Sequence, residues 1–226
     1  MSKALIIEDD VRISEDLKRL LSLNGWKAET CGNGADGLQL VTQFSYDLLL
    51  LDWCLPELTG VEICKRVRAK GISVPIIFIT AQSDIDSTEA GLEAGGDDYL
   101  TKPFNERELM ARIKSVMRRP RAVVDLEVLQ VGDLVLDEKK RIISYGAHST
   151  QLTATEHGLI GYLLRHREDS FSSSQLLAAV WQSDSEVSED SVRVHIRILR
   201  KKLELAGLPS LIVHRRGFGY SIELPG

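Results

Sequence analysis

Four consecutive leucines followed by an aspartate, within the stretch Tyr46–Pro56, constrain the fold of this chain most. A continuous apolar run of this length is typical of a strand buried on both faces, as the central strands of parallel sheets are. Asp52 would then stand at the carboxyl end of that strand. In open α/β sheets the functional crevice lies at those carboxyl ends. Asp52 is therefore the first candidate for a functional residue.

The first half of the chain alternates short apolar segments with amphipathic ones. The expected strands are residues 4–7, 27–30, 47–51, 74–79 and 98–100, and the expected helices are residues 11–23, 34–43, 61–70, 86–94 and 106–119. Five strands alternating with five helices predict an α/β fold, in which a parallel sheet is covered by helices on both faces.

Polar residues follow these strands at the points where they end. Glu8 and Asp9 end the first strand, Asp52 ends the third, Thr80 ends the fourth and Lys102 follows the fifth. Each alone is ordinary, since acidic turns are common, but all five are expected at one edge of the sheet. Three neighbouring carboxylates repel one another and need a cation, and an all-oxygen cluster suits Mg²⁺. With Lys102 and Thr80, the set suits transfer of a phosphoryl group to the carboxylate of Asp52.

The second half of the chain has a different plan. Short alternating segments at residues 126–128, 134–136 and 141–144 predict a small antiparallel sheet. Thr153 followed by Glu156 predicts a helix that begins with a capping box. Further helices are expected at residues 174–181 and from Ser188 or Glu189 to about Leu205, and a hairpin at residues 211–223.

Basic residues gather near the end of the chain, although the net charge is −5. The third of these helices shows Arg193, Arg197, Arg200 and Lys201 on the face opposite its apolar residues, and Arg216 lies near the tip of the hairpin. A basic helix followed by a hairpin is the plan of a winged helix-turn-helix, with the helix in the major groove of DNA and the hairpin arginine at the minor groove. The helix alone would fit an ordinary solvated surface, and the neighbouring hairpin arginine favours DNA contacts.

Residues 3–119 resemble the receiver domain of bacterial response regulators. The matching stretches are Leu-Ile-Ile-Glu-Asp-Asp, Leu-Leu-Leu-Leu-Asp-Trp-Cys-Leu-Pro-Glu-Leu-Thr-Gly, Ile-Ile-Phe-Ile-Thr-Ala and Gly-Gly-Asp-Asp-Tyr-Leu-Thr-Lys-Pro-Phe. The resemblance implies a flavodoxin-like, doubly wound parallel sheet of strand order 2-1-3-4-5. It also implies phosphorylation of Asp52. The Mg²⁺ ligands would be Asp9, Asp52 and the backbone carbonyl of Cys54, with Glu8 acting through water.

The same resemblance implies a switch, in which Tyr99 turns inward when Thr80 moves towards the phosphoryl group. It further implies that the peptide bond between Lys102 and Pro103 is cis, which proline permits at small energetic cost.

Residues of about 126–224 resemble the effector domain of the OmpR/PhoB group of response regulators. The matching stretches are Leu-Thr-Ala-Thr-Glu, Ser-Val-Arg-Val-His-Ile-Arg-Ile-Leu-Arg-Lys-Lys-Leu and Arg-Gly-Phe-Gly-Tyr. The resemblance implies base or phosphate contacts from His195, Arg197 and Arg200, with Arg216 in the wing. Arg193 stands where the group often has an acid, so a different base preference is expected. We therefore expect a receiver domain at residues 1–119, a linker at 120–125, and a smaller winged helix-turn-helix domain at 126–226.

Members of this group dimerise through the fourth helix, fifth strand and fifth helix of the receiver. The interface residues that correspond here form the pairs Asp98–Arg112 and Glu93–Lys114. Two departures stand against the usual dimer. Thr88 takes the place of a basic residue opposite Glu108, and Glu89 occupies an apolar position, where burying its charge would cost desolvation.

The sequence as a whole predicts a phosphorylation-dependent, DNA-binding transcription regulator of a two-component system, and not an enzyme. Its expected partners are a histidine kinase, double-stranded DNA and, on phosphorylation, a second copy of the chain, with contact to RNA polymerase left open. No apolar run approaches the roughly 20 residues of a membrane helix, and the N-terminus turns acidic too soon for a signal peptide. Cys31, Cys54 and Cys64 lack metal-binding spacing, so free thiols and a cytoplasmic location are expected.

Two alternatives remain at this stage. A phosphatase of the haloacid dehalogenase kind would carry a second aspartate two residues after the nucleophile, and here that position is Cys54. An atypical, unphosphorylated regulator would use its receiver only for dimerisation, and the complete acidic set with Thr80 and Lys102 argues against it.

Overall fold

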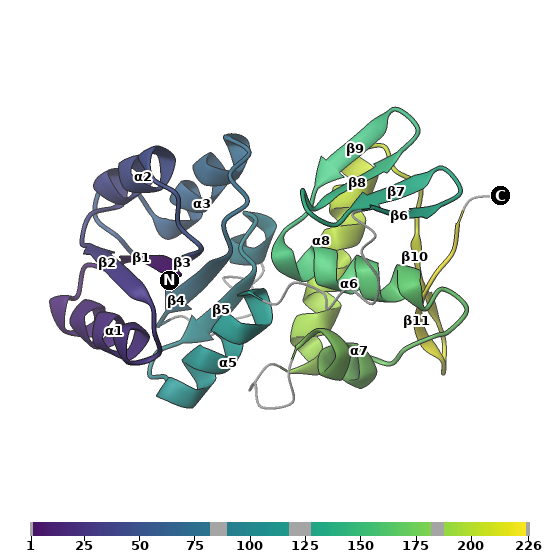
Figure 1. Cartoon of the computed structure of the whole chain (residues 1–226). Coiled ribbons are helices and arrows are strands. Elements are labelled where there is room, and N and C mark those ends of the chain that lie inside the picture. The colour runs from purple at the N-terminus through teal and green to yellow at the C-terminus, as the bar shows by residue number, and fades with distance from the viewer. Residues whose placement is uncertain (1, 82–89, 118–127, 182–187, 225–226) are drawn as a thin grey trace. The chain divides into compact units, whose positions relative to one another are not determined.

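The computed structural model describes residues 2–81, 90–117, 128–181 and 188–224. The chain divides into two compact units, an N-terminal unit of Met1–Met117 and a C-terminal unit of Arg118–Gly226, which are coloured purple to teal and teal to yellow in Figure 1. The linker expected at residues 120–125 lies outside the described residues.

The N-terminal unit is a five-stranded parallel sheet with helices on both faces. Its strands are β1 (Lys3–Ile7), β2 (Lys27–Cys31), β3 (Leu48–Asp52), β4 (Ile76–Thr80) and β5 (Asp98–Thr101). Their order across the sheet is β2-β1-β3-β4-β5, which confirms the predicted order. The helices are α1 (Val11–Leu23), α2 (Gly34–Gln43), α3 (Gly60–Ala69) and α5 (Glu106–Met117). Figure 1 shows α2 and α3 on one face of the sheet and α1 and α5 on the other. Residues 90–93 are also helical, while residues 86–89 of the expected fourth helix lie outside the description.

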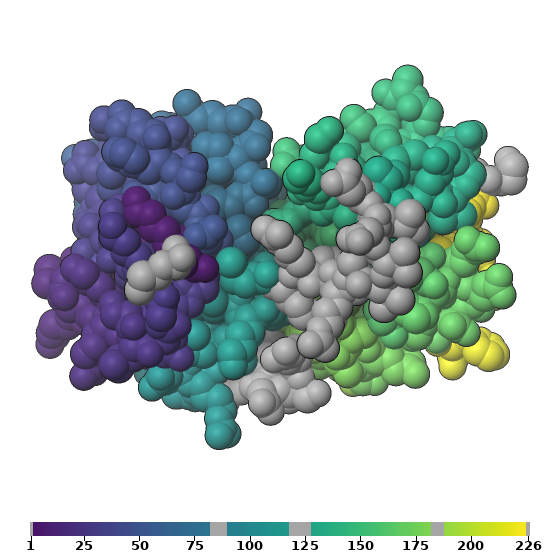
Figure 2. Space-filling model, viewed as in Figure 1, coloured from purple at the N-terminus to yellow at the C-terminus, as the bar shows by residue number. Residues whose placement is uncertain are grey.

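The four leucines of β3 explain this layering, because alternate side chains enter two different cores. Leu49 and Leu51 pack in the core that contains Ile63 and Val67 of α3. Leu48 and Leu50 pack in the opposite core, with side chains from α1 and α5. All four leucines are fully buried, and each such burial contributes about 1.5–3 kcal/mol. The start of β1, in contrast, is partly exposed. Dark purple atoms from the start of the chain are visible on the surface in Figure 2, and Lys3 is half-buried.

The C-terminal unit begins with a four-stranded antiparallel sheet and ends with a hairpin. The strands of the sheet are β6 (Val128–Val131), β7 (Leu134–Asp137), β8 (Ile142–Tyr145) and β9 (His148–Gln151). The helices α6 (Ala154–Arg165), α7 (Ser173–Val180) and α8 (Glu189–Leu205) follow, and then the hairpin of β10 (Ile212–Arg215) and β11 (Gly219–Ile222). One hydrophobic core joins the sheet, the three helices and the hairpin, with Trp181 at 0% exposure within it. This arrangement confirms the predicted winged helix-turn-helix.

Local sequence accounts for the start of α6. The Thr153 Oγ1 accepts a hydrogen bond from the Glu156 N–H at 3.3 Å, and the Glu156 carboxylate accepts one from the Thr153 N–H at 2.8 Å. The predicted capping box is therefore confirmed. The strand β9, in contrast, was not singled out, because its residues are polar and it lies at the edge of the sheet.

The described helices and the cysteines bear on two further expectations, a membrane span and the state of the thiols. No helix among them is long and apolar enough to cross a membrane. The three cysteines are free thiols, with Cys54 exposed, Cys31 half-buried and Cys64 buried.

Candidate functional site

The carboxyl edge of the five-stranded sheet brings together the acidic residues that were expected to converge. Glu8 and Asp9 follow β1, and Asp52 ends β3, which pairs directly with β1. Carboxylate oxygens of the three residues all lie within 4.8 Å of one another. Glu8 and Asp52 are buried and Asp9 is exposed, so solvent and small ions can reach the cluster at Asp9.

Lys102, just after β5, lies against two of these acids. Its Nζ is 2.8 Å from Asp52 Oδ2 and 2.8 Å and 3.0 Å from the two carboxylate oxygens of Glu8. Burial acts to lower the pKa of Lys102, but the hydrogen bonds to both carboxylates outweigh it and the pKa is raised. The ammonium group is therefore charged, yet it balances only one of three acids.

The excess of negative charge in the cluster affects the pKa of Glu8. Burial and the neighbouring Asp52 raise the pKa of the Glu8 carboxyl to about 7, against the lowering effect of Lys102. A carboxyl group that is buried beside another carboxylate resists ionisation. The cluster therefore favours an additional cation.

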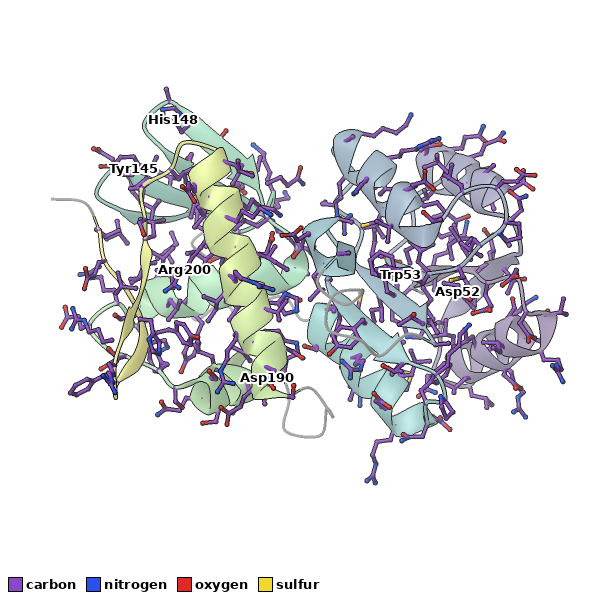
Figure 3. The ribbon with its side chains drawn as sticks, turned by 180° about the vertical axis from the view of Figure 1, so that it is seen from behind. Asp52, Trp53, Tyr145, His148, Asp190 and Arg200 are labelled. Carbon is purple, nitrogen blue, oxygen red and sulfur yellow. The ribbon has the colours of Figure 1, made fainter. Side chains whose placement is uncertain are left out.

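The backbone after β3 fixes the position of Asp52. The Cys54 N–H donates a hydrogen bond to Asp52 Oδ1 at 3.2 Å. The first residue of α3, Gly60, packs so closely that an added Cβ would lie 2.1 Å from the Asp52 carbonyl oxygen. Thr59 caps this helix through a capping box with Glu62. Figure 3 shows Asp52 and Trp53 where the central strand ends.

Thr80 and Tyr99, the expected switch pair, occupy adjacent strands. Thr80 ends β4 and is buried, and its carbonyl oxygen accepts a hydrogen bond from the Lys102 N–H at 2.7 Å. The half-buried ring of Tyr99, on β5, lies below the Arg112 guanidinium, whose Cζ is 5.5 Å from the ring centroid. The expected cis bond between Lys102 and Pro103 is present. The switch motion itself stays a prediction.

Arg112 forms a buried ion-pair cluster within the chain. Its Nη1 is 2.9 Å from Asp98 Oδ1 and its Nη2 is 3.1 Å from Glu108 Oε1. The Asp98–Arg112 pair was expected across a dimer interface, whereas the structure joins it inside one chain. Glu93 and Lys114, the second expected pair, are both exposed, and Thr88 and Glu89 lie outside the described residues.

The helix α8 carries the expected basic residues, but not all of them on its exposed face. Arg193, Arg197 and Lys201 are exposed. Arg200 is half-buried, and its Nε donates a hydrogen bond to the Ile212 carbonyl oxygen of β10 at 3.0 Å. Figure 3 shows Arg200 on the side of α8 that faces the hairpin. Arg200 therefore ties the helix to the hairpin.

His195, which was also expected to contact DNA, is buried in this structure, and its contact with DNA stays a prediction. Its side chain is 2% exposed and its ring packs against Trp181, with the centroids 5.4 Å apart. His195 lies three residues after Val192 and four before Leu199, both in the core, so helical periodicity places it on the inner face. Burial lowers the pKa of His195 to about 3, and the ring is neutral.

Arg216, the remaining residue predicted to contact DNA, lies in the hairpin. Arg216 is exposed between β10 and β11. The Phe218 N–H donates a hydrogen bond to the Arg215 carbonyl oxygen at 3.0 Å, and Gly217 adopts a positive φ of 83°, which glycine adopts without steric cost. This tight turn holds Arg216 at the tip.

Two acids near the start of α8 were missed in the sequence. The Arg193 Nη1 donates a hydrogen bond to Asp190 Oδ1 at 2.5 Å, and its Nη2 lies 3.7 Å from Glu189 Oε2. Their positions three and four residues before Arg193 could have indicated the pairing, because such residues are neighbours on a helix.

A doubly wound sheet with clustered acids and a lysine at its carboxyl edge, followed by a winged helix-turn-helix, defines a class of protein: the two-component response regulators.

Comparison with known proteins agrees with this class and narrows it. Residues 4–114 match the response regulator receiver domain, and residues 147–222 match the C-terminal domain of transcriptional regulatory proteins. The response regulator MprA of Mycobacterium sp. (strain KMS) is 37% identical over 223 residues, which cover 98% of this chain and 97% of MprA. The protein RcaC of Microchaete diplosiphon is 39% identical over 224 residues, or 99% of this chain, although the chain spans only 34% of RcaC.

A solved structure supports the same group. DrrB of Thermotoga maritima, described as an OmpR/PhoB homologue, is 28% identical, with a TM-score of 0.54 over 99% of this chain and 100% of that one. The chain therefore belongs to the OmpR/PhoB group of response regulators. It is a phosphorylation-dependent transcriptional regulator with a DNA-binding domain.

Proposed function

We propose that Asp52 is the residue that is phosphorylated, by a partner histidine kinase. The observation that carries this proposal is the position of Lys102, whose Nζ lies 2.8 Å from Asp52 Oδ2 beside a cluster of two further acids. Phosphoryl transfer needs mainly positioning and charge neutralisation, and these residues supply both at a buried carboxylate.

In the proposed reaction, a carboxylate oxygen of Asp52 attacks the phosphorus of a phosphohistidine on the kinase. A P–O bond forms and the P–N bond breaks. The electron pair of the P–N bond stays on the histidine nitrogen, which takes up a proton. Lys102 would then stabilise the phosphoryl oxygens, and the hydroxyl group of Thr80, at the end of the neighbouring strand, would donate a hydrogen bond to one of them.

The donor set fits Mg²⁺, since three carboxylates with oxygens within 4.8 Å of one another are the hard ligands that this ion prefers. We propose that Asp9, Asp52 and the backbone carbonyl of Cys54 hold it, with Glu8 acting through water. When bound, it would supply positive charge opposite the phosphoryl oxygens.

The proposed DNA contacts come from α8 and the hairpin. Arg193, Arg197 and Lys201 form an exposed basic face on the helix, and Arg216 projects from the hairpin. Arginine and lysine in the major groove, with an arginine at the minor groove, fit a duplex. Arg200 would act indirectly, through its bond to β10.

Phosphorylation would favour a homodimer that binds paired half-sites. Glu93 and Lys114 are proposed for its interface because both are exposed. The Asp98–Arg112 pair would take part only by exchanging an internal ion pair for an intermolecular one. We place the regulator in the cytoplasm, with RNA polymerase as a further partner at activated promoters.

A phosphorylation assay with a matched control tests the site. The full chain is incubated with acetyl phosphate and Mg²⁺, and the phospho-species is separated on a phosphate-affinity gel. Asp52→Asn should abolish the shifted band. Asp10→Asn should retain it, because Asp10 caps α1 and asparagine caps equally well. An undiminished band in Asp52→Asn would refute the assignment.

Binding to DNA tests the coupling of the two units. Affinity for a selected duplex should rise after treatment with the phosphodonor in the wild-type chain and stay constant in Asp52→Asn. Binding that is indifferent to the phosphodonor in both proteins would instead support a receiver that serves only for dimerisation.

A further inference from the structure

The first turn of α8 places acids beside the predicted DNA-facing surface. Glu189 and Asp190 open the helix, and Arg193 follows one turn later. All three side chains are exposed, at 49%, 80% and 56% respectively. Figure 3 shows Asp190 in this first turn, far along the helix from Arg200. In recognition helices, the N-terminal residues are the ones that contact base edges.

Acids at this position carry a cost for a DNA-binding helix, because they approach negatively charged phosphates. A gain in folding stability is a weak explanation, since exposed ion pairs contribute little. Acids in the first turn also stabilise a helix through its dipole. Any acid in the first turn would do this, whether or not it contacted an arginine. The contact with Arg193 is more specific.

That contact limits the directions in which Arg193 can point. Its Nη1 donates to Asp190 Oδ1 at 2.5 Å, and its Nη2 lies 3.7 Å from Glu189 Oε2. A free arginine side chain must lose considerable rotamer entropy to bind a base. Here two carboxylates already hold the guanidinium group near the start of the helix.

The held guanidinium group retains the donors that a base would use. Arginine has five N–H groups, and Asp190 accepts a hydrogen bond from only one of them. Donors therefore remain on both terminal nitrogens. Two parallel N–H groups match the O6 and N7 acceptors of guanine in the major groove.

We propose that Arg193 contacts a guanine in each half-site and that Asp190 is the positioning residue that sets this preference. The inference rests on the proposed role of α8 as the helix that contacts bases. It adds to that role the identity of one base and the residue that fixes how strongly it is preferred.

The test compares base preferences of matched variants. The full-length, phosphodonor-treated chain first selects its preferred duplex from a random library. Affinities are then measured for that duplex and for every single base-pair substitution in it. The proteins are the wild type, Arg193→Ala, Asp190→Asn and Glu204→Gln. Glu204 is an exposed acid at the other end of α8, so its variant controls for the change in charge alone.

The wild type should prefer guanine at one position of each half-site by about tenfold or more, which corresponds to about 1.4 kcal/mol. Arg193→Ala should lose the preference at that position only. Asp190→Asn should lower it at the same position to about threefold, because a neutral amide oxygen holds the guanidinium group less firmly than a carboxylate does. Glu204→Gln should tighten binding to all sequences alike and keep the preference.

Two results would overturn the proposal. One is that Asp190→Asn behaves like Glu204→Gln, which would make the pair an ordinary surface ion pair. The other is that Arg193→Ala keeps the preference for guanine. Arg197→Ala and Lys201→Ala separate this failure from a failure of the proposed function. If they weaken binding while Arg193→Ala keeps the preference, only this inference fails, and if all three variants bind as the wild type does, α8 is not the DNA-contacting helix.

Discussion

Replacing His195 with leucine should remove a source of acid instability from the C-terminal unit. Burial against Trp181 lowers the pKa of the His195 imidazole to about 3 from its ordinary value of 6.5. In the unfolded chain the ring takes up a proton as the pH falls through 6.5, whereas in the folded chain it stays neutral until the pH approaches 3. The unfolded state therefore binds more protons between these values, and folding stability falls as the pH falls.

The two pKa values set the size of the effect. Between pH 7.5 and pH 5 this one group should cost the wild type about 2 kcal/mol of unfolding free energy, and the cost should grow further towards pH 3. His195→Leu cannot take up the proton, so it should lose about 2 kcal/mol less over the same interval. Carboxylates that titrate in this range are present in both proteins and cancel in the comparison.

Urea unfolding at pH 7.5 and pH 5 measures this difference. Trp26→Phe and Trp53→Phe in the background leave Trp181 as the fluorescent reporter of the C-terminal unit. His214→Leu is the matched control, since it makes the same replacement at an exposed histidine of the same unit. If His195→Leu and the wild type lose equal stability on acidification, the His195 ring is solvated in the folded protein. That result would contradict the burial of the His195 side chain.

Three other predictions concern the acidic cluster and α8, the helix that is proposed to contact DNA. Mg²⁺ at ten times its dissociation constant should stabilise the chain by about 1.4 kcal/mol, and the rise in the thermal unfolding midpoint should be reversed by EDTA. If Asp9→Asn gains the same stability from Mg²⁺, Asp9 is not a ligand. Gly60→Ala should destabilise the chain by about 1–3 kcal/mol, because its Cβ would lie 2.1 Å from the Asp52 carbonyl oxygen. In thermal unfolding, the control Gly32→Ala should lose much less stability, because its Cβ would have no neighbour closer than 3.8 Å. Similar losses in the two variants would argue against this packing at Gly60. Arg197→Ala should reduce the slope of log affinity against log salt concentration by about 0.9 if the side chain contacts one phosphate; an unchanged slope in a salt titration would exclude that contact.

The sheet and its acidic edge could be predicted because their determinants are local. A run of apolar residues marks each central strand, and the residue that ends the run marks the carboxyl edge. Glu8, Asp52 and Lys102 are far apart in the chain, but each lies at or just after the carboxyl end of a strand of the same parallel sheet, so strand order brings them together. The capping box at Thr153 was equally local.

The remaining features depend on tertiary packing. The DNA contact of His195 was expected from the resemblance to the effector domain, and not from its position on the helix, which places its ring against Trp181. Arg200 is basic and near the exposed face, yet a carbonyl oxygen of β10 captures its Nε. Arg112 has two acidic neighbours, and only the fold decides that both pair with it inside one chain. The edge strand β9 lacks the apolar alternation that would reveal it.

The bond between Arg200 and Ile212 has a consequence for promoter architecture. It joins α8 to β10 of the hairpin, so if both contact the duplex as proposed, the distance between their two contacts on the DNA is constrained. A promoter half-site with one base pair inserted between the segments proposed to contact α8 and the hairpin should then bind more weakly, even when both segments keep their preferred sequences.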